Sequence, residues 1–550
     1  MLRERVGSTA VVLLLFALPW SGCRGQAAPD KVSCAVDNTA PNEADKALLD
    51  RRYQDAERLY GEMLAKSPGL DTAEAGVVRA LVGEEKLADA LALATKDNAD
   101  RAKDPVLLDA LGDVRFRRGE VDEAANAWNQ AMRLDRCYAY THYEVYRFLS
   151  LSGMYATAQR QLDLAHTLWP ANREIEQLWF RSHAKPQTAE QTLAWLKQRA
   201  GDPSLSDEDK QGIQMAIKGL ESREKGDCEP VAAVTEAKLP MVPISEGAAW
   251  SPQDIYAAGL DLQINGKRRR LEIDTGASGL LLSRSAAKSL GLAPELEFKE
   301  GGIGDKGSAA AFVAHVDDIR IGPMEFRNCV VRVLEENRDA MGDIDGLIGP
   351  DVFRDYLVTL DIPGREVRIG PLPARPGDAP GKPPSLVTSD SDDMEQSDAD
   401  RARDRYIAPE MKDWDKVFRS GHFLIFPTWI GNAPVKLFVM DTGAAQTTIT
   451  PAAAREVTYV SSDDDATVSG LSGQVKTVMA ANAVTITFGG VRQQTLGMRS
   501  YDSRMFTEAA GAEISGLIGF PTLRELVISI DYRDNLVHVV YDPKKGYHMR

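Results

Sequence analysis

Two short segments of this 550-residue chain carry the same acidic motif. Asp274 opens an Asp-Thr-Gly sequence directly after Leu-Glu-Ile at 271–273, and Asp441 opens a second one after the apolar residues 437–440. When two carboxyl groups lie about 3 Å apart, both cannot ionise, and the pair holds one proton between them. Such a pair can accept a proton from water and donate one to a leaving group. If the fold brings the two motifs together, hydrolysis by an activated water molecule is the chemistry that they can perform.

The residues that follow the two motifs also occur twice. The sequence Gly-Leu-Ile-Gly starts at Gly346 after the first aspartate and at Gly516 after the second, at nearly the same distance along the chain. Each copy precedes a predicted short helix and a predicted strand. A glycine-rich segment lies between the aspartate and this motif in both copies, at 301–304 and at 470–473. Four landmarks in the same order at nearly equal spacing indicate a duplicated domain.

The segments before the motifs have the pattern of β-strands. Leu260 and Leu262 alternate with polar residues, Gly266 marks a turn, and Leu-Glu-Ile at 271–273 then leads to Asp274. Alternation with a period of two predicts strands with one buried face. A matching strand at 437–440 leads to the second motif. The second half of the chain is therefore predicted to be all-β.

These landmarks resemble those of the aspartic peptidases, and specifically the retropepsin-like group. The similar features are Asp-Thr-Gly-Ala, units of about 120 residues, a glycine-rich flap, and a hydrophobic-hydrophobic-Gly sequence near the end of each unit. The resemblance covers residues 251–372 and 420–542, and it implies two lobes of the acid protease fold that form a pseudo-dimer. It also implies an aspartic endopeptidase whose catalytic residues are Asp274 and Asp441.

The resemblance assigns roles to residues around the aspartates. Thr275 and Thr442 are expected to form hydrogen bonds across the lobe interface, and Gly276 and Gly443 to let the backbone turn tightly. Two hairpin tips are expected to close over an extended peptide and exclude water. Their residues are Gly302, Ile303, Gly304, Gly470, Leu471 and Gly473.

The residue after each Asp-Thr-Gly predicts how the carboxyl pair titrates. Ala277 and Ala444 stand where pepsins carry a hydroxyl group that favours the charged form of the aspartate. Without those donors, the pair is expected to be less acidic. We therefore expect activity that extends towards neutral pH.

Several alternatives for the β-rich half stay open at this point. Each lobe could pair with the other lobe of its own chain or with its twin in a second molecule. A non-catalytic scaffold that binds polypeptides is the alternative function, because clefts persist on folds that have lost their chemistry. The Pro-rich and acidic stretch between the lobes is predicted to be disordered, either as a passive tether or as a self-cleavage site.

The first half of the chain repeats with a constant period. Alanine recurs every 34 residues. Four residues after each alanine, a second set of residues recurs with the same period, and most of its members are bulky. These positions are Ala56, Ala90, Ala124 and Ala158, followed by Tyr60, Ala94, Trp128 and Leu162. The pattern resembles the tetratricopeptide repeat (TPR), in which helix pairs stack into an all-α solenoid. It implies either a concave face that holds a protein partner or a stack that only spaces or stabilises the lobes.

The N-terminus predicts export. Arg3 and Arg5 precede an apolar stretch too short to span a bilayer, which ends in Ser-Gly-Cys at Cys23. This end resembles a bacterial lipobox, although Trp20 stands where an aliphatic residue is usual. The resemblance implies lipidation of Cys23 and a lipoprotein on a membrane surface that faces the periplasm or the exterior. Ordinary cleavage near this position is the alternative, and the chain is exported in both cases.

Composition limits the partners. The chain has 65 Lys and Arg against 81 Asp and Glu, a net charge of −16, so a nucleic acid is not an expected partner. Five dispersed cysteines predict neither a disulfide framework nor a zinc site. We expect no metal, no cofactor, a protein or peptide substrate, and membrane contact only through the lipid anchor.

These observations give a predicted order of segments. It is a signal peptide at 1–23, a linker at 24–40, TPR-like helical repeats at 41–224, a linker at 225–250, a first lobe at 251–372, a linker at 373–419 and a second lobe at 420–545. The predicted function is an exported aspartic endopeptidase whose helical repeats recruit a substrate or partner.

Overall fold

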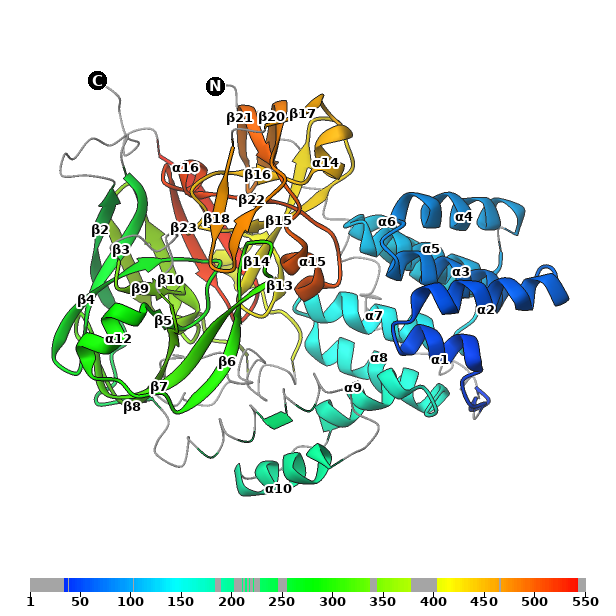
Figure 1. The fold of residues 1–550 in the computed structure, drawn as a ribbon, viewed down its shortest axis with the longest axis horizontal. Coiled ribbons are helices and arrows are strands. Elements are labelled where there is room, and N and C mark those ends of the chain that lie inside the picture. Colours follow the sequence, from blue (N-terminus) through cyan, green and yellow to red (C-terminus); the bar gives the residue numbers. More distant parts are fainter. Residues whose placement is uncertain are drawn as a thin grey trace, which may run out of the picture. The chain divides into compact units, whose positions relative to one another are not determined.

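The computed structural model describes residues 34–37, 39–101, 103–183, 189–201, 210, 213–214, 217, 221, 228–245, 255–336, 344–376, 403–463 and 466–542. The chain divides into two compact units, residues 1–150 with 156–184 and residues 151–155 with 185–550. In their described parts, the first unit is helical and the second is built mostly from strands (Figure 1).

Consecutive helices build the first unit. They are α1 (Glu43–Leu49), α2 (Tyr53–Lys66), α3 (Asp71–Gly83), α4 (Leu87–Asp100), α5 (Pro105–Arg117), α6 (Val121–Leu134), α7 (Ala139–Leu151), α8 (Tyr155–Leu168) and α9 (Arg173–His183), and α10 (Ala189–Ala200) follows in the second unit. Polar side chains cap several helix starts; for example, Asn42 forms a capping box on α1, and Asp104 accepts from the first turn of α5. No helix in the described part of the chain is both long and apolar enough to cross a membrane.

The helices follow the period of the sequence. Helices α2, α4, α6 and α8 begin at equal intervals, at Tyr53, Leu87, Val121 and Tyr155. The repeated alanines Ala56, Ala90, Ala124 and Ala158 are at most 1% exposed. Since an alanine leaves room for a close helix contact, the repeat marks where successive helices touch. The prediction of a helical first half is confirmed.

Glycine and a large ring share one of these helix contacts. Trp128 on α6 is fully buried, and a methyl group added to Gly112 on α5 would lie 2.4 Å from its Nε1. The indole N–H donates to Asp113 Oδ1 at 3.2 Å, which fixes the ring. Gly76 and Tyr60 repeat the arrangement between α3 and α2, where an added methyl group would lie 2.5 Å from the phenol ring.

Two disulfides show that the prediction of no disulfide framework was wrong. Cys34 is bonded to Cys137, and Cys228 to Cys329. The bonded residues lie 103 and 101 positions apart, so no local spacing of cysteines marks them. Closing a loop of this length in the unfolded chain stabilises the fold by up to about 4–5 kcal/mol. Cys23, the fifth cysteine, lies outside the described residues.

The first β-lobe contains the first Asp-Thr-Gly motif. Its elements are β1 (Glu229–Pro230), β2 (Ala237–Ser245), β3 (Ile255–Ile264), β4 (Lys267–Ile273), β5 (Leu280–Leu282), α12 (Arg284–Leu290), β6 (Leu296–Gly301), β7 (Ser308–Ile321), β8 (Met324–Leu334), β9 (Gly346–Ile348), η2 (Pro350–Phe353), β10 (Leu357–Asp361) and β11 (Glu366–Gly370). The turn between β3 and β4 has positive φ at Asn265 and Gly266, as a two-residue hairpin loop requires.

The second β-lobe contains the second motif. Its elements are η3 (Pro409–Met411), β12 (Asp415–Lys416), β13 (Phe418–Ser420), β14 (Phe423–Ile430), β15 (Lys436–Met440), β16 (Thr448–Ile449), α14 (Pro451–Arg455), β17 (Val460–Ser462), β18 (Val468–Gly470), β19 (Gly473–Val475), β20 (Met479–Phe488), β21 (Val491–Ser500), α15 (Arg504–Ala510), β22 (Ile514–Ile518), α16 (Phe520–Leu523), β23 (Leu526–Asp531) and β24 (Leu536–Tyr541). Strand β15 pairs in parallel with β22, as β4 pairs with β9 in the first lobe. The duplication in sequence is thus a duplication of topology.

An antiparallel sheet joins the two lobes. The strands expected after the two glycine motifs, β10 and β23, pair with each other, with Thr359 opposite Ser529. Strands β11 and β2 extend this sheet on one side, and β24 and β12 extend it on the other. One hydrophobic cluster runs through both lobes and includes Leu360 and Ile528 from the paired strands. Backbone hydrogen bonds and a common core therefore fix one lobe against the other.

Two of the three predicted linkers, 225–250 and 373–419, contain regular structure. Strand β2 lies inside 225–250, where Pro240 and Pro243 interrupt the usual strand composition. Its first half pairs with β11 and its second half with β3, so each proline faces one neighbouring strand. In the linker predicted at 373–419, Arg375 forms a buried ion pair with Asp534 at 2.5 Å, and β12 and β13 begin the second lobe. The acidic part of that stretch lies outside the described residues.

The contact between Gly112 and Trp128 gives a first prediction. We expect Gly112→Ala to lower the free energy of unfolding of the helical unit by about 1–3 kcal/mol, because the added methyl group overlaps a ring that cannot move aside. The matched control is Gly61→Ala on α2, where an added methyl group meets nothing within 4 Å. That control should be neutral or stabilising by up to about 1 kcal/mol. Urea unfolding of the full chain followed by circular dichroism measures both, and equal stability of the two variants would contradict the packing account.

Candidate active site

Equivalent strands place the two aspartates. Asp274 follows β4, and Asp441 follows β15. The backbone N–H of each donates to an isoleucine carbonyl on the neighbouring parallel strand, Ile348 on β9 or Ile518 on β22, at 3.0 Å in both cases. Because Gly-Leu-Ile-Gly forms those neighbouring strands, the glycine motif fixes the point at which each acidic loop leaves its sheet.

Two threonines bind the acidic loops to each other reciprocally. The Thr275 N–H donates to Thr442 Oγ1 at 3.0 Å, and the Thr442 N–H donates to Thr275 Oγ1 at 3.0 Å. Each hydroxyl also donates to the carbonyl that precedes the other aspartate, Met440 or Ile273, at 2.7 Å. Both threonines are at most 2% exposed, so water does not replace these bonds. The hydrogen bonds hold the two Asp-Thr-Gly loops of a single chain side by side.

The carboxyl groups lie between the joined loops. The Gly276 N–H donates to Asp274 Oδ1 at 2.7 Å, and the N–H groups of Gly443 and Ala444 donate to Asp441 Oδ1 at 3.0 Å. A methyl group on Gly443 would lie 2.4 Å from Cγ of Asp274, and one on Gly276 would lie 2.9 Å from Cγ of Asp441. Each motif needs glycine because the carboxyl group of the other lobe occupies the space of a side chain.

Burial raises the pKa values of both aspartates, and their interaction raises that of Asp441 alone. For Asp441, burial is the largest cause, and the charge of Asp274 and the hydrogen bond with it raise the pKa further, well above its usual range. Burial also raises the pKa of Asp274, while the Gly276 N–H, the hydrogen bond with Asp441 and nearby His422 act against the rise. The pair therefore retains a proton at a pH where exposed carboxyl groups are ionised.

Two further titratable residues lie at the pair, and the sequence did not single them out. His422, in the turn between β13 and β14, donates from Nε2 to the Gly276 carbonyl at 3.1 Å in the matching tautomer. Glu272, two residues before Asp274, is 6% exposed. Burial, and then the charges of Asp274 and Asp441, raise the pKa of Glu272 well above its usual range. An acidic residue between the apolar Leu271 and Ile273 at the end of a predicted strand was the signal available for Glu272. Nothing in the sequence near His422 links it to the motif.

Close packing supports the loops from behind. A methyl group on Gly349 would lie 2.3 Å from the carbonyl oxygen of Ala277, and one on Gly519 would lie 2.3 Å from that of Gln446. In the first lobe, the carboxylate of Asp351 also accepts two hydrogen bonds from the loop after Asp274, at 2.6 and 3.0 Å. The last glycine of each motif is thus required by the backbone that passes over it.

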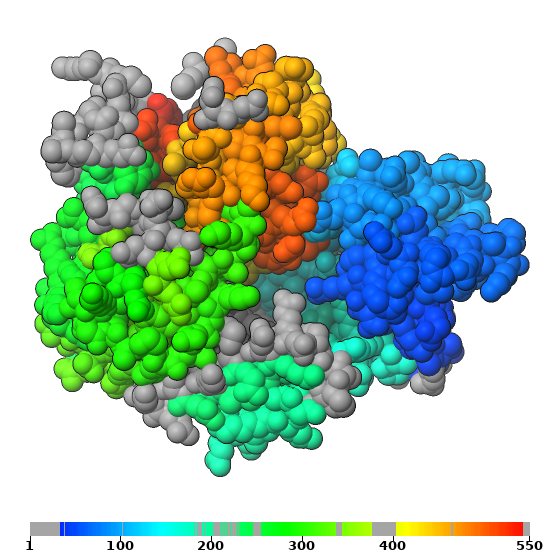
Figure 2. Space-filling view, viewed as in Figure 1, coloured from blue at the N-terminus to red at the C-terminus, as the bar shows by residue number. Residues whose placement is uncertain are grey.

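The two predicted flaps are hairpin tips, between β6 and β7 and between β18 and β19, and they contact each other. The Ser472 N–H donates to the Ile303 carbonyl at 3.0 Å, and the Lys306 N–H donates to the Ser472 carbonyl at 3.2 Å. In Figure 2 the green surface of the first lobe meets the orange surface of the second. The contact contains Gly302, Ile303, Gly304, Gly470, Leu471 and Gly473.

The flap contact is not symmetric. Asp305 of the first flap accepts a hydrogen bond from the Lys476 N–H at 3.0 Å, and the Lys476 ammonium lies 3.9 Å from the same carboxylate. Gly304 has φ of 137°, and a Cβ atom there would lie 2.5 Å from the Ser472 carbonyl carbon. The first tip therefore supplies the acidic side chain of the contact, while each tip contains a glycine with positive φ, Gly304 and Gly473.

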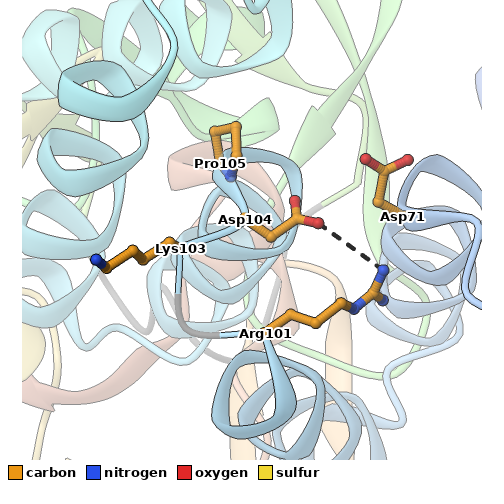
Figure 3. Close-up of a pocket in the computed structure, with 5 residues that line it drawn as sticks. All are labelled: Asp71, Arg101, Lys103, Asp104 and Pro105. Carbon is orange, nitrogen blue, oxygen red and sulfur yellow. Dashed lines mark ion pairs between the residues drawn. The ribbon is translucent and has the colours of Figure 1, made fainter.

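A hollow of about 600 Å³ lies on the helical unit (Figure 3). It is lined by Asp71, Arg101, Lys103, Asp104 and Pro105. Arg101 forms ion pairs with Asp104, at 3.8 Å, and with Glu74, so its charge is balanced. No residue of the duplicated motifs lines this hollow, and we assign it no chemistry. Among the described residues, no group of three or more His, Cys, Asp or Glu side chains is placed to hold a metal ion.

Comparison with known proteins agrees with the duplicated motifs. Residues 260–352 and 426–522 match the family model of the aspartyl proteases, one match in each lobe. The UBA domain-containing protein Mud1 of Schizosaccharomyces pombe is 28% identical over 118 residues, which are 21% of this chain and 33% of that protein. This chain thus spans about a third of the length of that curated relative. The family match supports a protease-like function for the β-rich half.

Two solved structures are similar to parts of the chain. The aspartic proteinase from Irpex lacteus matches with a TM-score of 0.32 and 10% identity, over 57% of this chain and 99% of its own. A retropepsin-like aspartic protease from Rickettsia conorii matches with a TM-score of 0.18 and 18% identity, over 24% of this chain and 98% of its own.

The threonine hydrogen bonds give a second prediction. Thr275→Val keeps the shape of the side chain but leaves the buried Thr442 N–H and Met440 carbonyl without their partner. We expect the free energy of unfolding of the β-rich unit to fall by about 2–5 kcal/mol, since each unsatisfied buried group costs about 1–3 kcal/mol. Thr275→Ser retains the hydroxyl and should lose less than half as much. Urea unfolding measures both variants, and a Val variant as stable as the wild type would show that the hydroxyl does not hold the loops together.

Proposed function

We propose that this chain is an exported aspartic endopeptidase, in which the two β-lobes form an intramolecular pseudo-dimer and Asp274 and Asp441 share one catalytic proton. The observation that supports this most directly is the reciprocal hydrogen bonding of Thr275 and Thr442, with each adjacent glycine against the other lobe's carboxyl group. A protein that bound peptides without cleaving them would not need two interacting carboxyl groups with raised pKa values, one buried and the other half-buried.

The chemistry follows from one proton shared by two carboxyl groups. The ionised carboxyl takes a proton from a water molecule as the water oxygen attacks the carbonyl carbon of the peptide. The protonated carboxyl donates its proton to the carbonyl oxygen, which gives a neutral tetrahedral diol. When the C–N bond breaks, the protonated carboxyl donates its proton to the amide nitrogen and the ionised carboxyl accepts a proton from a hydroxyl of the diol. The pair again holds one proton, and no covalent link to the enzyme forms.

The flaps control the entry of a substrate and keep bulk water away from the carboxyl pair. In the described structure the tips are joined by backbone hydrogen bonds at 3.0 and 3.2 Å, which an entering peptide must break or replace. We propose that the tips open for an extended substrate and close over it, so that the carboxyl pair acts away from bulk water.

We also propose roles for the remaining segments. The helical unit is proposed to be a TPR solenoid that recruits a protein substrate or partner, and the constant spacing of its helices supports this. Export with a lipid on Cys23 would place the enzyme on a bacterial membrane surface that faces the periplasm or the exterior. The two disulfides are compatible with such an oxidising compartment, and they leave Cys23 as the remaining cysteine.

Digestion of a peptide library tests the catalytic proposal. We expect the wild type to cleave and Asp274→Asn and Asp441→Asn each to be slower by roughly 10²–10⁴-fold, because the pair loses its acid or its base. The control is Asp317→Asn, which removes an exposed carboxylate from β7. Mass spectrometry of the products at several pH values measures all four proteins.

The same digestion separates the two functions considered. Cleavage that persists in both Asn variants would exclude this carboxyl pair. If no protein cleaves at any pH, the binding scaffold becomes the supported function.

The residues after each motif give a prediction for pH. Activity requires one proton on the pair and is lost as pH rises through the upper pKa, so raised pKa values extend activity towards neutral pH. Ala444→Ser adds a hydroxyl donor beside Asp441, whose Oδ1 already accepts from the Ala444 N–H at 3.0 Å. The added hydrogen bond favours the charged form, and we expect the alkaline limb of the rate profile to move down by about 1 pH unit. An unchanged limb in Ala444→Ser, or a wild-type optimum below about pH 3, would contradict this assignment.

A further inference from the structure

Glu272 is a buried carboxyl group that the catalytic chemistry does not use. Its neighbours on β4, Leu271 and Ile273, point into the main core, so the Glu272 side chain lies on the opposite face of the sheet. The register places it beside Gly259 of β3 and Leu347 of β9. Strands β4, β5 and β9 are neighbours in the green part of Figure 1. The carboxyl group is thus flanked by a residue with no side chain and by an apolar one.

The face that carries Glu272 is lined by a second, smaller apolar cluster. Leu347, Leu281 and Ile244 belong to it and are buried. Its partly buried members include Ala277 of the first acidic loop and Leu471 of the flap of the other lobe. The cluster therefore extends from the sheet to the first acidic loop and to the flap tip of the other lobe. We expect a substrate side chain next to the scissile bond to lie along it.

No cation balances Glu272 in the described part of the chain, where the structure gives it no ion pair and no hydrogen bond. The charges that act on it are those of Asp274 and Asp441. Since a buried carboxyl without a partner is unfavourable, a cation from outside would be held strongly there. Lysine and arginine match this environment, because their aliphatic stems pack against apolar walls while the charged end reaches a carboxylate.

We propose that Glu272 is a specificity-determining residue, which selects a substrate with a lysine or arginine side chain in one subsite beside the scissile bond. This rests on the proposed peptidase function and adds a substrate class to it. The equivalent position in the second lobe is Val439, two residues before Asp441. Val439 is fully buried and lies opposite Leu517. The two halves of the site thus differ, with a basic side chain bound on one side and an apolar side chain on the other.

Matched peptides test the proposal on the full-length protein. Each pair differs at one position near the scissile bond, with lysine against norleucine or arginine against citrulline, which keep the length and remove the charge. The wild type should prefer the charged peptide at one position by about tenfold or more in kcat/KM. Glu272→Gln should reduce this preference to less than about threefold while changing the rate on the norleucine peptide by less than about threefold. Asp317→Asn, at the exposed carboxylate of β7, should retain the full preference.

The outcomes distinguish a failure of the role proposed for Glu272 from a failure of the proposed peptidase function. Cleavage of charged and neutral peptides at equal rates would overturn the role of Glu272 and leave the peptidase function in place. A basic preference that survives in Glu272→Gln would do the same. If the wild type cleaves none of the peptides and no library peptide, the peptidase function fails, and the specificity fails with it. A loss of rate on all peptides alike in Glu272→Gln would show a structural role and overturn the proposal.

Discussion

The site depends on the reciprocal hydrogen bonds between Thr275 and Thr442. They join two loops that lie 167 residues apart in sequence. They also bring the carboxyl group of each lobe so close to the other loop that only glycine fits after each threonine. Because the carboxyl groups are brought together by these buried bonds, their raised pKa values are a consequence of the fold rather than of either loop alone. A single lobe has one carboxyl group and half of the hydrogen bonds, and so it has no means of sharing a proton.

Other contacts between the lobes keep this small set of bonds in register. Strands β10 and β23 pair on one side of the site, and the main core cluster is continuous across them. The flap tips meet on another side, through Ser472, Ile303 and Lys306. The paired strands bury apolar side chains, whereas the flap contact consists largely of backbone hydrogen bonds and glycines. Because the flap contact buries less apolar surface than the paired strands do, separating the flaps costs less free energy than separating the strands. The flaps are therefore the contact better suited to opening.

The sequence predicts the helices and strands whose positions depend on a local pattern of apolar and polar residues. The strands before the aspartates, the strands after the glycine motifs and the regularly spaced helices follow from periodicity, and the structure contains them. It did not predict what depends on distant partners. The disulfides join residues about 100 positions apart. Strand β2 was not predicted because Pro240 and Pro243 are unusual in strands. They fit here because the first half of β2 pairs with β11 and the second half with β3. His422 reaches the first acidic loop only through the fold of the second lobe.

The halves of the site are similar in backbone and different in side chains, as Glu272 against Val439 and the one-sided Asp305 to Lys476 contact illustrate. An enzyme assembled from two identical subunits presents the same surface to both ends of its substrate. Such an enzyme cannot distinguish the two directions, N-terminus to C-terminus or the reverse, in which a peptide can lie across its site. Fusing the halves into one chain removes that degeneracy, so that each half can diverge independently. Under the proposed peptidase function, such a chain would recognise the direction in which its peptide substrate lies.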